Sequence, residues 1–440
     1  MVEQPHGMRT TTAALTVLLL CATPGMSAPA SAAECGTFDG RGCAPESRRV
    51  DLADPLFSNP TSITNPLFPI SRLHSAVLLG HVDGKRFRTE TTLLPGTETV
   101  AMNGQQVPVL VSQYMAFLGR DLEEVALDRY AQADDGSAWY LGEDVFDYRN
   151  GSVAITEGTW LAGRDGPPAM IMPATPQVGD VYRPENVPGV VFEEVTVTEV
   201  GRTVRGPTGP VTGALVVDEL HLDGTHEAKV FAPSYGEFRT GGGGDLEALA
   251  LAVPTDARSG PEPARLQPLA TSAEAILESA RLRDWQAAAA TARRLRSDWR
   301  VIRTDAPPWR VGARLHRDLA ALDRAVERRR PARLAQTAID VWASVLDLQL
   351  TYRPPALVDV ARMHLWTQQL RVHAAARHLG GVTGAVATLE WIRDRVAGTL
   401  TATEQQDLDS RLGDIRAATD ARNMRAAADH AARLGASLRA

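Results

Sequence analysis

The hydrophobic and polar positions of this chain change their period near residue 270, and the change divides the sequence into two halves. Before it, apolar residues alternate with polar ones at a period of two in 107–117, 190–200 and 214–222, which is typical of half-buried strands. No helical pattern separates these stretches, so we expect antiparallel hairpins rather than a parallel nucleotide-binding sheet. The turns expected between strands are Asp83-Gly84, Asp135-Gly136, Asn150-Gly151 and Asp223-Gly224.

The second half has the period of helices. Two Thr-x-x-Glu sequences have the form of capping boxes and predict helix starts at Thr271 and Thr401. Six of the eight tryptophans lie here and predict a bundle core, with an aromatic ligand box as the alternative. The expected breaks are Pro307-Pro308, Pro331, Pro354-Pro355, Gly380-Gly381 and Gly398, which delimit about six or seven helices. The tryptophans are Trp285, Trp299, Trp309, Trp342, Trp366 and Trp391.

Together these patterns predict an α+β protein, with an N-terminal antiparallel β-sheet domain followed by a separate C-terminal helical bundle. Prolines and small polar residues at 254–268 favour neither helix nor central strand, and therefore predict a linker. The predicted units are a signal peptide at 1–33, a disulfide-containing segment at 34–64, the β domain at 65–253, the Pro-rich linker at 254–269 and the bundle at 270–440.

Charge follows the same division. The 440 residues carry 46 basic and 53 acidic side chains, a formal net charge of -7, which resolves into -15 over 34–269 and +8 over 270–440. Only Lys85 and Lys229 are lysines, so the abundant arginine is interpreted as compositional bias. The acidic balance argues against nucleic acid as a partner. The split favours docking of the two halves on each other, or contact with an anionic envelope surface.

The N-terminus has the organisation of a secretory signal peptide. Arg9 precedes an apolar run at 13–21, which is shorter than the ~20 residues that span a bilayer. Small residues that follow predict cleavage near Ala33. Cys21 follows Leu20, where a lipoprotein signal has a small residue, so a lipoprotein is disfavoured. Because no later segment is long and apolar enough for a transmembrane anchor, we expect a secreted or cell-envelope-associated protein.

Cleavage of the signal peptide leaves two cysteines, Cys35 and Cys43, in a glycine-rich segment. An exported compartment permits a disulfide between them, and the glycines let the loop close. Two free thiols are the alternative.

Most motifs that carry catalysis are absent from the sequence, which has no G-x-S-x-G, S-x-x-K, H-E-x-x-H, C-x-x-C or phosphate-binding loop. His364, His373 and His378 lie close together, but their spacings of nine and five do not place two ligands on one face of a helix. We therefore expect no metal site and no cofactor.

The densest group of polar and aromatic residues lies at 130–160. If Asn150-Gly151 forms a two-residue turn, Asp144 lies opposite Glu157 on the next strand. With a tight turn on its other side as well, the same strand places Asp144 diagonal to Arg129. An otherwise apolar face then carries two opposed carboxylates and one arginine.

Two interpretations of this group stay open. Opposed like charges need a cation, so Asp144 and Glu157 could share Arg129 in a structural ion network. Alternatively, Asp144, Glu157 and the nearby Glu143 could bind a cation or a polar ligand, with the neighbouring aromatic residues as walls. A bulge at Gly142 would shift the register and remove the basis of both.

The same stretch resembles a pattern found in exported bacterial proteins and lipoproteins of unassigned function. The matching motifs are Trp139-Tyr140-Leu141-Gly142-Glu143-Asp144-Val145, Thr156-Glu157-Gly158-Thr159-Trp160, Ile171-Met172-Pro173-Ala174, Val178-Gly179-Asp180, an opening Asn65-Pro66-Leu67-Phe68-Pro69 and a closing Phe231-Ala232-Pro233-Ser234-Tyr235-Gly236-Glu237. The resemblance covers about 65–253 and implies export, but it brings no established reaction. It departs from the family pattern at Arg129 and at Ala169-Met170.

The sequence therefore predicts an exported binding or interaction protein of the bacterial cell envelope or extracellular space, and leaves enzymatic activity open. The expected partners are an anionic cell-envelope polymer or another exported protein. The alternative function is a secreted hydrolase that uses the carboxylates Glu143, Asp144 and Glu157.

Overall fold

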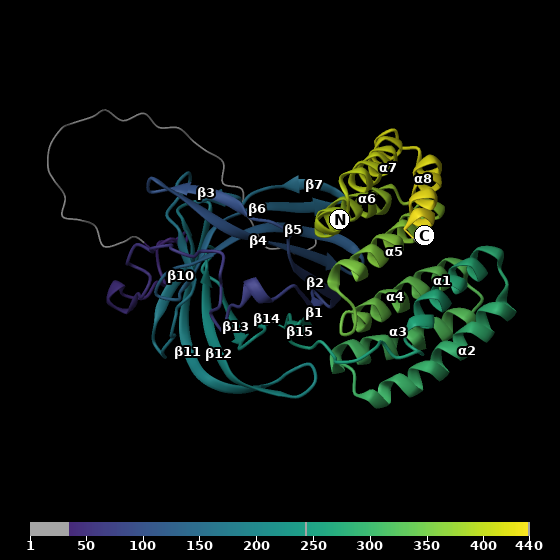
Figure 1. Cartoon of the computed structure of the whole chain (residues 1–440), viewed down its shortest axis with the longest axis horizontal. Helices are drawn as coiled ribbons and strands as arrows, with labels where there is room; N and C mark the ends of the chain where they lie inside the picture. The colour runs from purple at the N-terminus through teal and green to yellow at the C-terminus, as the bar shows by residue number, and fades with distance from the viewer. Residues whose placement is uncertain (1–34, 243, 439–440) are drawn as a thin grey trace.

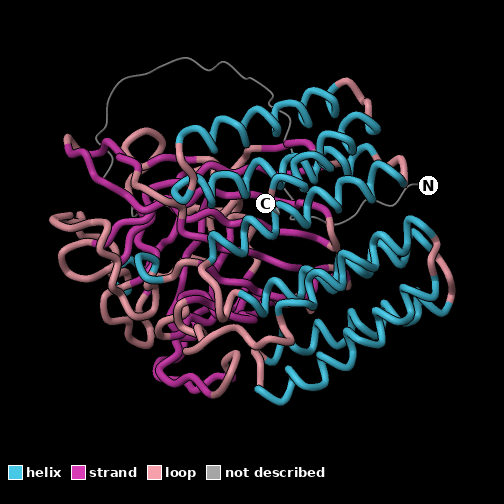
Figure 2. The backbone as a smooth tube through the Cα atoms, turned by 45° about the vertical axis from the view of Figure 1, so that its right-hand side comes forward, coloured by secondary structure: helices cyan, strands magenta, loops and turns pink. Residues whose placement is uncertain are grey.

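An antiparallel sheet and a group of helices make up the described part of the chain, which comprises residues 35–242 and 244–438 of a computed structural model. The sheet comes first in the chain, and the helices that follow gather on one side of its strands (Figure 1 and Figure 2). The predicted α+β class is confirmed. The predicted signal peptide, Cys21 and the cleavage point near Ala33 lie outside the described residues.

Neighbouring strands of the sheet are nearly always neighbours in sequence. The order is β10-β11-β12-β13-β14-β15-β1-β2-β4-β5-β6-β7, so the chain runs up and down and its last strand returns to pair with its first. Three short strands lie off this path, because β3 pairs with β4 and both β8 and β9 pair with β6. The strands are β1 (Ser75–Val82), β2 (Lys85–Leu93), β3 (Glu98–Met102), β4 (Gln105–Leu118), β5 (Asp121–Gln132), β6 (Ala138–Arg149), β7 (Ser152–Ile155), β8 (Trp160–Leu161), β9 (Ala169–Met172), β10 (Val181–Val187), β11 (Val191–Arg205), β12 (Pro210–His221), β13 (His226–Ala232), β14 (Gly236–Gly241) and β15 (Glu247–Val253).

The sheet curls until its two ends meet, because β10 packs against β9, which is itself paired with β6. Side chains from both ends then share one packed core, which fills the face away from the helices. We call this the inner face. Its buried residues include Val100, Tyr130, Trp139, Tyr140, Trp160, Met172, Tyr182, Val197, Leu215 and Phe231.

The helices form two successive four-helix units. In the first, α1 packs on α2 and α4 while α3 packs on the same two helices, and α5 to α8 repeat this arrangement. Contact between α4 and α5 joins the units. The helices are α1 (Gln267–Leu282), α2 (Trp285–Ile302), α3 (Trp309–Glu327), α4 (Pro331–Gln349), α5 (Pro355–Ala375), α6 (Leu379–Val396), α7 (Ala402–Asp420) and α8 (Met424–Ser437).

Arginine, rather than glycine, makes four of the turns between helices. Arg283, Arg329, Arg377 and Arg422 each have positive φ and lie just before α2, α4, α6 and α8. They recur at intervals of roughly 46 residues, which marks a repeated helix hairpin. Turn prediction relies on Gly and Pro, so the expected six or seven helices omitted the breaks at Arg283 and Arg422.

Of the two predicted capping boxes, only one exists. Thr401 accepts from the Glu404 amide, and the Glu404 side chain accepts from the Thr401 amide, as expected. The helix predicted to start at Thr271 instead starts at Gln267, because Pro268 occupies its first turn, where a missing N–H costs nothing.

The helices dock on the sheet through apolar side chains of the face opposite the inner core. Val77 and Leu79 of β1 join the core of the first helical unit. Farther along the sheet, Phe117 stacks on Trp366 of α5 with ring centroids 5.5 Å apart. The sheet and the first helical unit therefore share one hydrophobic core.

Two glycine contacts bring the β6–β7 turn directly against α6. A Cβ on Gly151 would lie 2.2 Å from the Gly380 carbonyl oxygen and 2.4 Å from the Gly384 amide nitrogen. Gly151 also has φ +80°, as the predicted Asn150-Gly151 turn requires. The Gly380-Gly381 pair, expected to break a helix, lies inside α6, where Gly380 and Gly384 make room for this turn.

The segment before the sheet is fastened to it. Cys35 and Cys43 form the predicted disulfide, with Cα atoms 5.5 Å apart. Next to it, the Phe38 amide donates to the Leu222 carbonyl at 2.8 Å, and Glu194 accepts from the Ala44 amide at 2.6 Å.

Candidate functional site

Arg129 and Asp144 do form an ion pair, with Arg129 Nη2 and Asp144 Oδ2 2.7 Å apart. The second carboxylate on Arg129 is Glu98 of β3, whose Oε2 lies 2.7 Å from Nε. Asp144 is 37% exposed and Glu98 48%, so the pair lies at the surface. Its contribution to stability is therefore small.

Glu157 lies elsewhere, and the expected opposition of Asp144 and Glu157 is wrong. The ladder pairs Asp147 with Ile155 and then Glu143 with Trp160, so no residue of β7 or β8 lies opposite Asp144. Glu157 occupies the exposed turn between β7 and β8. The cause is irregularity in β6, at Asp147 and at Gly142, which has φ +129°.

The bulge at Gly142 also decides where Glu143 points. Asp128 pairs with Glu143 and Tyr130 with Tyr140, so one residue of β5, Arg129, lies opposite two of β6, Leu141 and Gly142. The four paired side chains therefore lie on the inner face, where Tyr140 donates to Asp128 Oδ1 at 2.9 Å. Asp144 projects to the other face, so Glu143, Asp144 and Glu157 do not converge on one site.

A group of carboxylates gathers on the inner face. Glu143 of β6 meets Glu185 of β10 where the two ends of the curled sheet approach each other. Burial, with the charge of Glu193, raises the pKa of Glu185 to about 8. Burial, with the charge of Glu185, raises the pKa of Glu143 well above its usual value. Glu185 therefore holds its proton near neutral pH.

The register of three strands places a histidine and a lysine beside this group. Glu185 pairs with Glu193, and Glu193 with His221, so these three side chains form a row across β10, β11 and β12. His221 Nδ1 lies 3.5 Å from Glu193 Oε1, and His221 Nε2 lies 3.6 Å from Glu219 Oε1. Lys229 Nζ lies 2.6 Å from the same Glu219 oxygen.

Tyr182 occupies the next row. It pairs with Val195, which pairs with Glu219, so the Tyr182 ring lies on the same face as Glu219. The ring is 0% exposed, and its hydroxyl has no hydrogen-bond partner among the described residues. Burial, followed by the charge of Glu219, raises the pKa of Tyr182.

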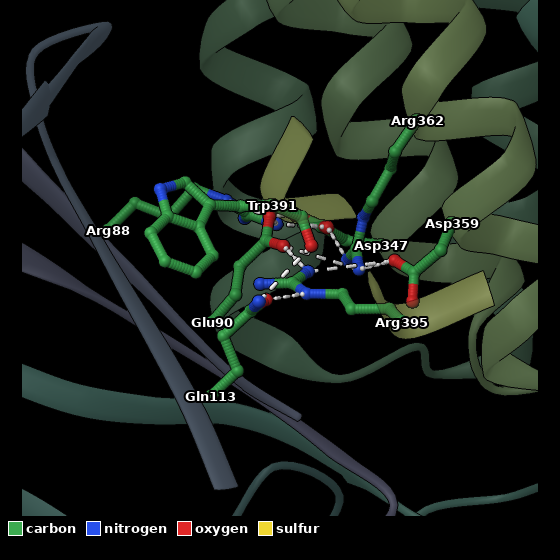
Figure 3. Close-up of polar contacts among 8 residues, drawn as sticks. All are labelled: Arg88, Glu90, Gln113, Asp347, Asp359, Arg362, Trp391 and Arg395. Carbon is green, nitrogen blue, oxygen red and sulfur yellow. Dashed lines mark hydrogen bonds and ion pairs between the residues drawn. The ribbon is translucent and has the colours of Figure 1, made fainter. Parts of the chain in front are cut away.

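The opposite face of the sheet carries a buried charge network that joins it to the helices (Figure 3). Glu90 of β2 receives Arg395 Nη1 at 2.6 Å and Arg88 Nη2 at 2.7 Å. Arg88 also reaches Asp347 of α4 at 2.6 Å. Arg362 of α5 reaches Asp347 as well, with an N–O distance of 3.2 Å.

Gln113 and Asp359 complete the network around Arg395, which is 0% exposed. Gln113 accepts from Arg395 Nε and donates to the Trp391 carbonyl at 3.1 Å. Figure 3 shows the Arg395 guanidinium between Glu90 on the strand side and Asp359 on the helix side. Burial alone would raise the pKa of Glu90, but the charges of Arg362, Arg88 and Arg395 hold that pKa well below its usual value.

A second ion-pair group continues the docking surface. Arg120 of the β4–β5 turn pairs with Asp340 of α4 at 2.6 Å, and Arg86 of β2 pairs with Asp318 of α3 at 3.1 Å. In both pairs the acidic half of the chain supplies the arginine and the basic half supplies the carboxylate. The net charges of the halves predict the opposite, with arginines from the helices and carboxylates from the sheet.

A third group consists of arginines without carboxylates. Arg205 at the end of β11 and Arg310 in the first turn of α3 both lie over the Trp309 ring, with Cζ 4.0 and 4.4 Å from its centroid. Arg239 of β14 lies near them, since burial and the charges of Arg239 and Arg205 lower the pKa of Arg310. None of the three has a carboxylate within ion-pair distance among the described residues. We call Arg205, Arg239, Arg310 and Trp309 the arginine cluster.

The histidine prediction needs one correction. His373 near the end of α5 and His378 just before α6 have Nδ1 atoms 3.4 Å apart, because the turn at Arg377 reverses the chain between them. Spacing along one helix could not show this. His364 lies apart, with Nε2 3.0 Å from Glu274 Oε1.

The tryptophans of the helical half, predicted to form a bundle core, lie in different environments. Trp299 and Trp342 lie in the core of the first helical unit, as expected. Trp366 and Trp391 instead pack against the sheet. The Trp309 ring packs against the guanidinium groups of Arg205 and Arg310.

Comparison with known proteins does not assign the chain to a family. The sequence matches no protein-family model, and no curated protein is significantly similar to it. The resemblance over 65–253 therefore stays a prediction. Within the described residues, no helix combines the length and hydropathy needed to cross a membrane.

Proposed function

We propose that this chain is an exported, non-enzymatic binding protein of the cell envelope, which holds a phosphate-bearing anionic polymer on the arginine cluster. The observation that carries the proposal is that Arg205, Arg239 and Arg310 gather at Trp309 with no carboxylate in ion-pair distance among the described residues. Some exposed arginines elsewhere pair with a carboxylate, as Arg281 does with Glu278, and others, such as Arg324 and Arg333, have no such pair among the described residues. Arg205 and Arg310 differ from both kinds because their guanidinium groups lie over one tryptophan ring.

The chemistry of the cluster suits phosphate. A guanidinium is planar and donates two parallel hydrogen bonds to a phosphate or carboxylate. Contact with the Trp309 ring fixes Arg205 and Arg310 before any ligand arrives, which lowers the entropic cost of binding. Burial, followed by the charges of Arg239 and Arg205, lowers the pKa of Arg310, and a bound anion would offset the repulsion among the three arginines.

The cluster also has a rigid support. The Trp309 amide donates to the Pro207 carbonyl at 2.9 Å, so the turn after β11 is tied to the start of α3. The arginines come from the sheet and from a helix, and the docked halves hold them at a fixed spacing. The disulfide of Cys35 with Cys43 agrees with the predicted export of the chain.

Binding of polyphosphate to the purified full-length chain tests the proposal, with uncharged dextran and polyglutamate as comparison polymers. The triple variant R205Q/R239Q/R310Q should bind polyphosphate at least about tenfold more weakly than the wild type. The matched control is R202Q/R281Q/R411Q, which removes three exposed arginines that are paired with carboxylates. It should bind within about twofold of the wild type.

Equal losses in both triple variants would contradict a defined site and indicate nonspecific attraction. No binding by the wild type at low ionic strength would contradict the function itself. Tighter binding of polyglutamate than polyphosphate would move the proposal from phosphate to carboxylate polymers.

A further inference from the structure

We propose that Glu193, Glu219 and His221 form a binding site for a divalent transition-metal ion such as Zn²⁺ or Mn²⁺ on the inner face of the sheet. One ligand atom from each of the three side chains lies within 4.8 Å of the other two. Two carboxylates and an imidazole are a donor set that such ions accept, with water completing the coordination. This site is independent of the arginine cluster and of the proposed function.

The backbone sets up this grouping. Glu193 of β11 lies directly opposite His221 of β12, and Glu219 lies two residues before His221 on the same face. Central strands of a sheet hold side chains at fixed separations, which favours a preorganised site.

The Tyr182 hydroxyl is an independent indication of a ligand. It belongs to a side chain that is 0% exposed, lies on the face of Glu219, and has no hydrogen-bond partner among the described residues. A buried hydroxyl without a partner costs free energy. Water on a bound ion, or the ion itself, would give this oxygen a partner.

Several charged groups face the site. Lys229 of β13 holds Glu219, Glu227 of β13 lies 3.8 Å from His221 Nε2, and Glu185 of β10 neighbours Glu193. Carboxylates outnumber cations here, so an added divalent ion improves the charge balance. Lys229 competes with the ion for Glu219. Removal of Lys229 should therefore strengthen binding at a metal site, whereas it would weaken a closed network of ion pairs.

Calorimetric titration of the metal-free full-length chain with Zn²⁺, repeated with Mn²⁺, tests the proposal. The wild type should bind one ion that is lost or weakened at least about tenfold in His221→Gln and in Glu193→Gln. Lys229→Met should strengthen binding at least about threefold, because it removes a competing cation. The matched controls are His226→Gln and Glu199→Gln, both exposed positions on neighbouring strands, which should leave affinity unchanged.

A wild-type chain that binds no ion overturns the proposal. So does an affinity that His221→Gln leaves unchanged but that His373→Gln abolishes, because the ion would then occupy the pair of His373 and His378. If Lys229→Met folds and binds more weakly than the wild type, the four groups form an ion network and not a metal site. If His221→Gln does not fold, Glu193→Gln and Lys229→Met still decide the question.

Discussion

Arg395 is the residue whose loss should most clearly separate the sheet from the helices. Its side chain is 0% exposed, and its guanidinium lies 2.6 Å from Glu90 and 3.7 Å from Asp359. It also donates from Nε to Gln113. The substitution Arg395→Met keeps much of the side-chain volume and removes the charge, so Glu90 and Asp359 lose a partner in a buried site.

Removing one member of a buried ion pair costs about 3 to 5 kcal/mol, because the other charge stays buried without full compensation. Glu90 keeps Arg88, and Asp359 keeps Arg362 at 2.9 Å, so we expect the lower part of this range, about 3 kcal/mol. Arg393→Met is the matched control, because Arg393 lies two residues away on α6 and pairs with the 48% exposed Asp409. Its loss should cost less than about 1 kcal/mol.

Urea unfolding of the two variants measures these values, with helical circular dichroism and tryptophan fluorescence as separate probes. In the wild type both probes should report one transition, since the two parts share a core. In Arg395→Met the urea concentration at the midpoint of unfolding should fall. If this network is a main coupling between sheet and helices, circular dichroism and fluorescence should then report transitions at different urea concentrations. A loss equal to that of Arg393→Met would refute the reasoning, because it would mean that the buried network adds no more than a surface pair. A double-mutant cycle with Glu90→Gln should give a coupling energy of at least about 1 kcal/mol.

Two further predictions concern the sheet. Burial, with the charge of Asp147, raises the pKa of Glu124 to about 7 in the folded protein. The stability that Glu124 contributes is therefore fully present below the pKa of this group in the unfolded chain, and it is lost as pH rises through about 7. Glu124→Gln should therefore match the wild type near pH 4 and exceed it by about 2 kcal/mol at pH 8 in denaturant unfolding, whereas the same gain in Glu199→Gln would contradict this origin. Gly151→Ala places a Cβ 2.2 Å from the Gly380 carbonyl oxygen, whereas Gly104→Ala meets open space at a similar φ of +73°. Thermal unfolding should show a larger loss for Gly151→Ala by about 2 kcal/mol, and equal losses would mean that α6 moves aside freely.

Local patterns were sufficient to predict the class of fold. Alternation of apolar residues identified β4, β11 and β12, and the Asn150-Gly151 turn has the residues that a type I′ hairpin needs. The turns at Arg283 and Arg422 could not be predicted, because a residue with a Cβ is disfavoured at positive φ. Backbone hydrogen bonds at the helix end close each turn, such as the one from the Asp284 amide to the Ser279 carbonyl. The curl of the sheet depends on long-range contact between β9 and β10, which no local pattern encodes.

The candidate sites show the same limit more sharply. The sequence indicated the pair of Arg129 and Asp144, but one bulge at Gly142 moved Glu143 to the inner face and left Glu157 in a turn. A bulge changes register by one residue, and one residue reverses the face of every later side chain. The inner group needs residues from β10 to β13 as well, and only the closed sheet brings them to Glu143.

The charge split of the chain has a different consequence from the one its net values suggest. The docking surface takes Arg314, Arg362 and Arg395 from the helices but also Asp318, Asp340, Asp347 and Asp359. The helical half thus gives the interface more carboxylates than arginines, so its positive excess lies on its remaining surface. The sheet gives the interface Arg86, Arg88 and Arg120 against Glu90 alone, and keeps its negative excess elsewhere in the same way. Attraction between unlike halves therefore does not explain the split. The arginine cluster joins Arg310 of the helical half to Arg205 and Arg239 of the sheet, so an anion bound there would be held by both halves and not by the positive excess of one.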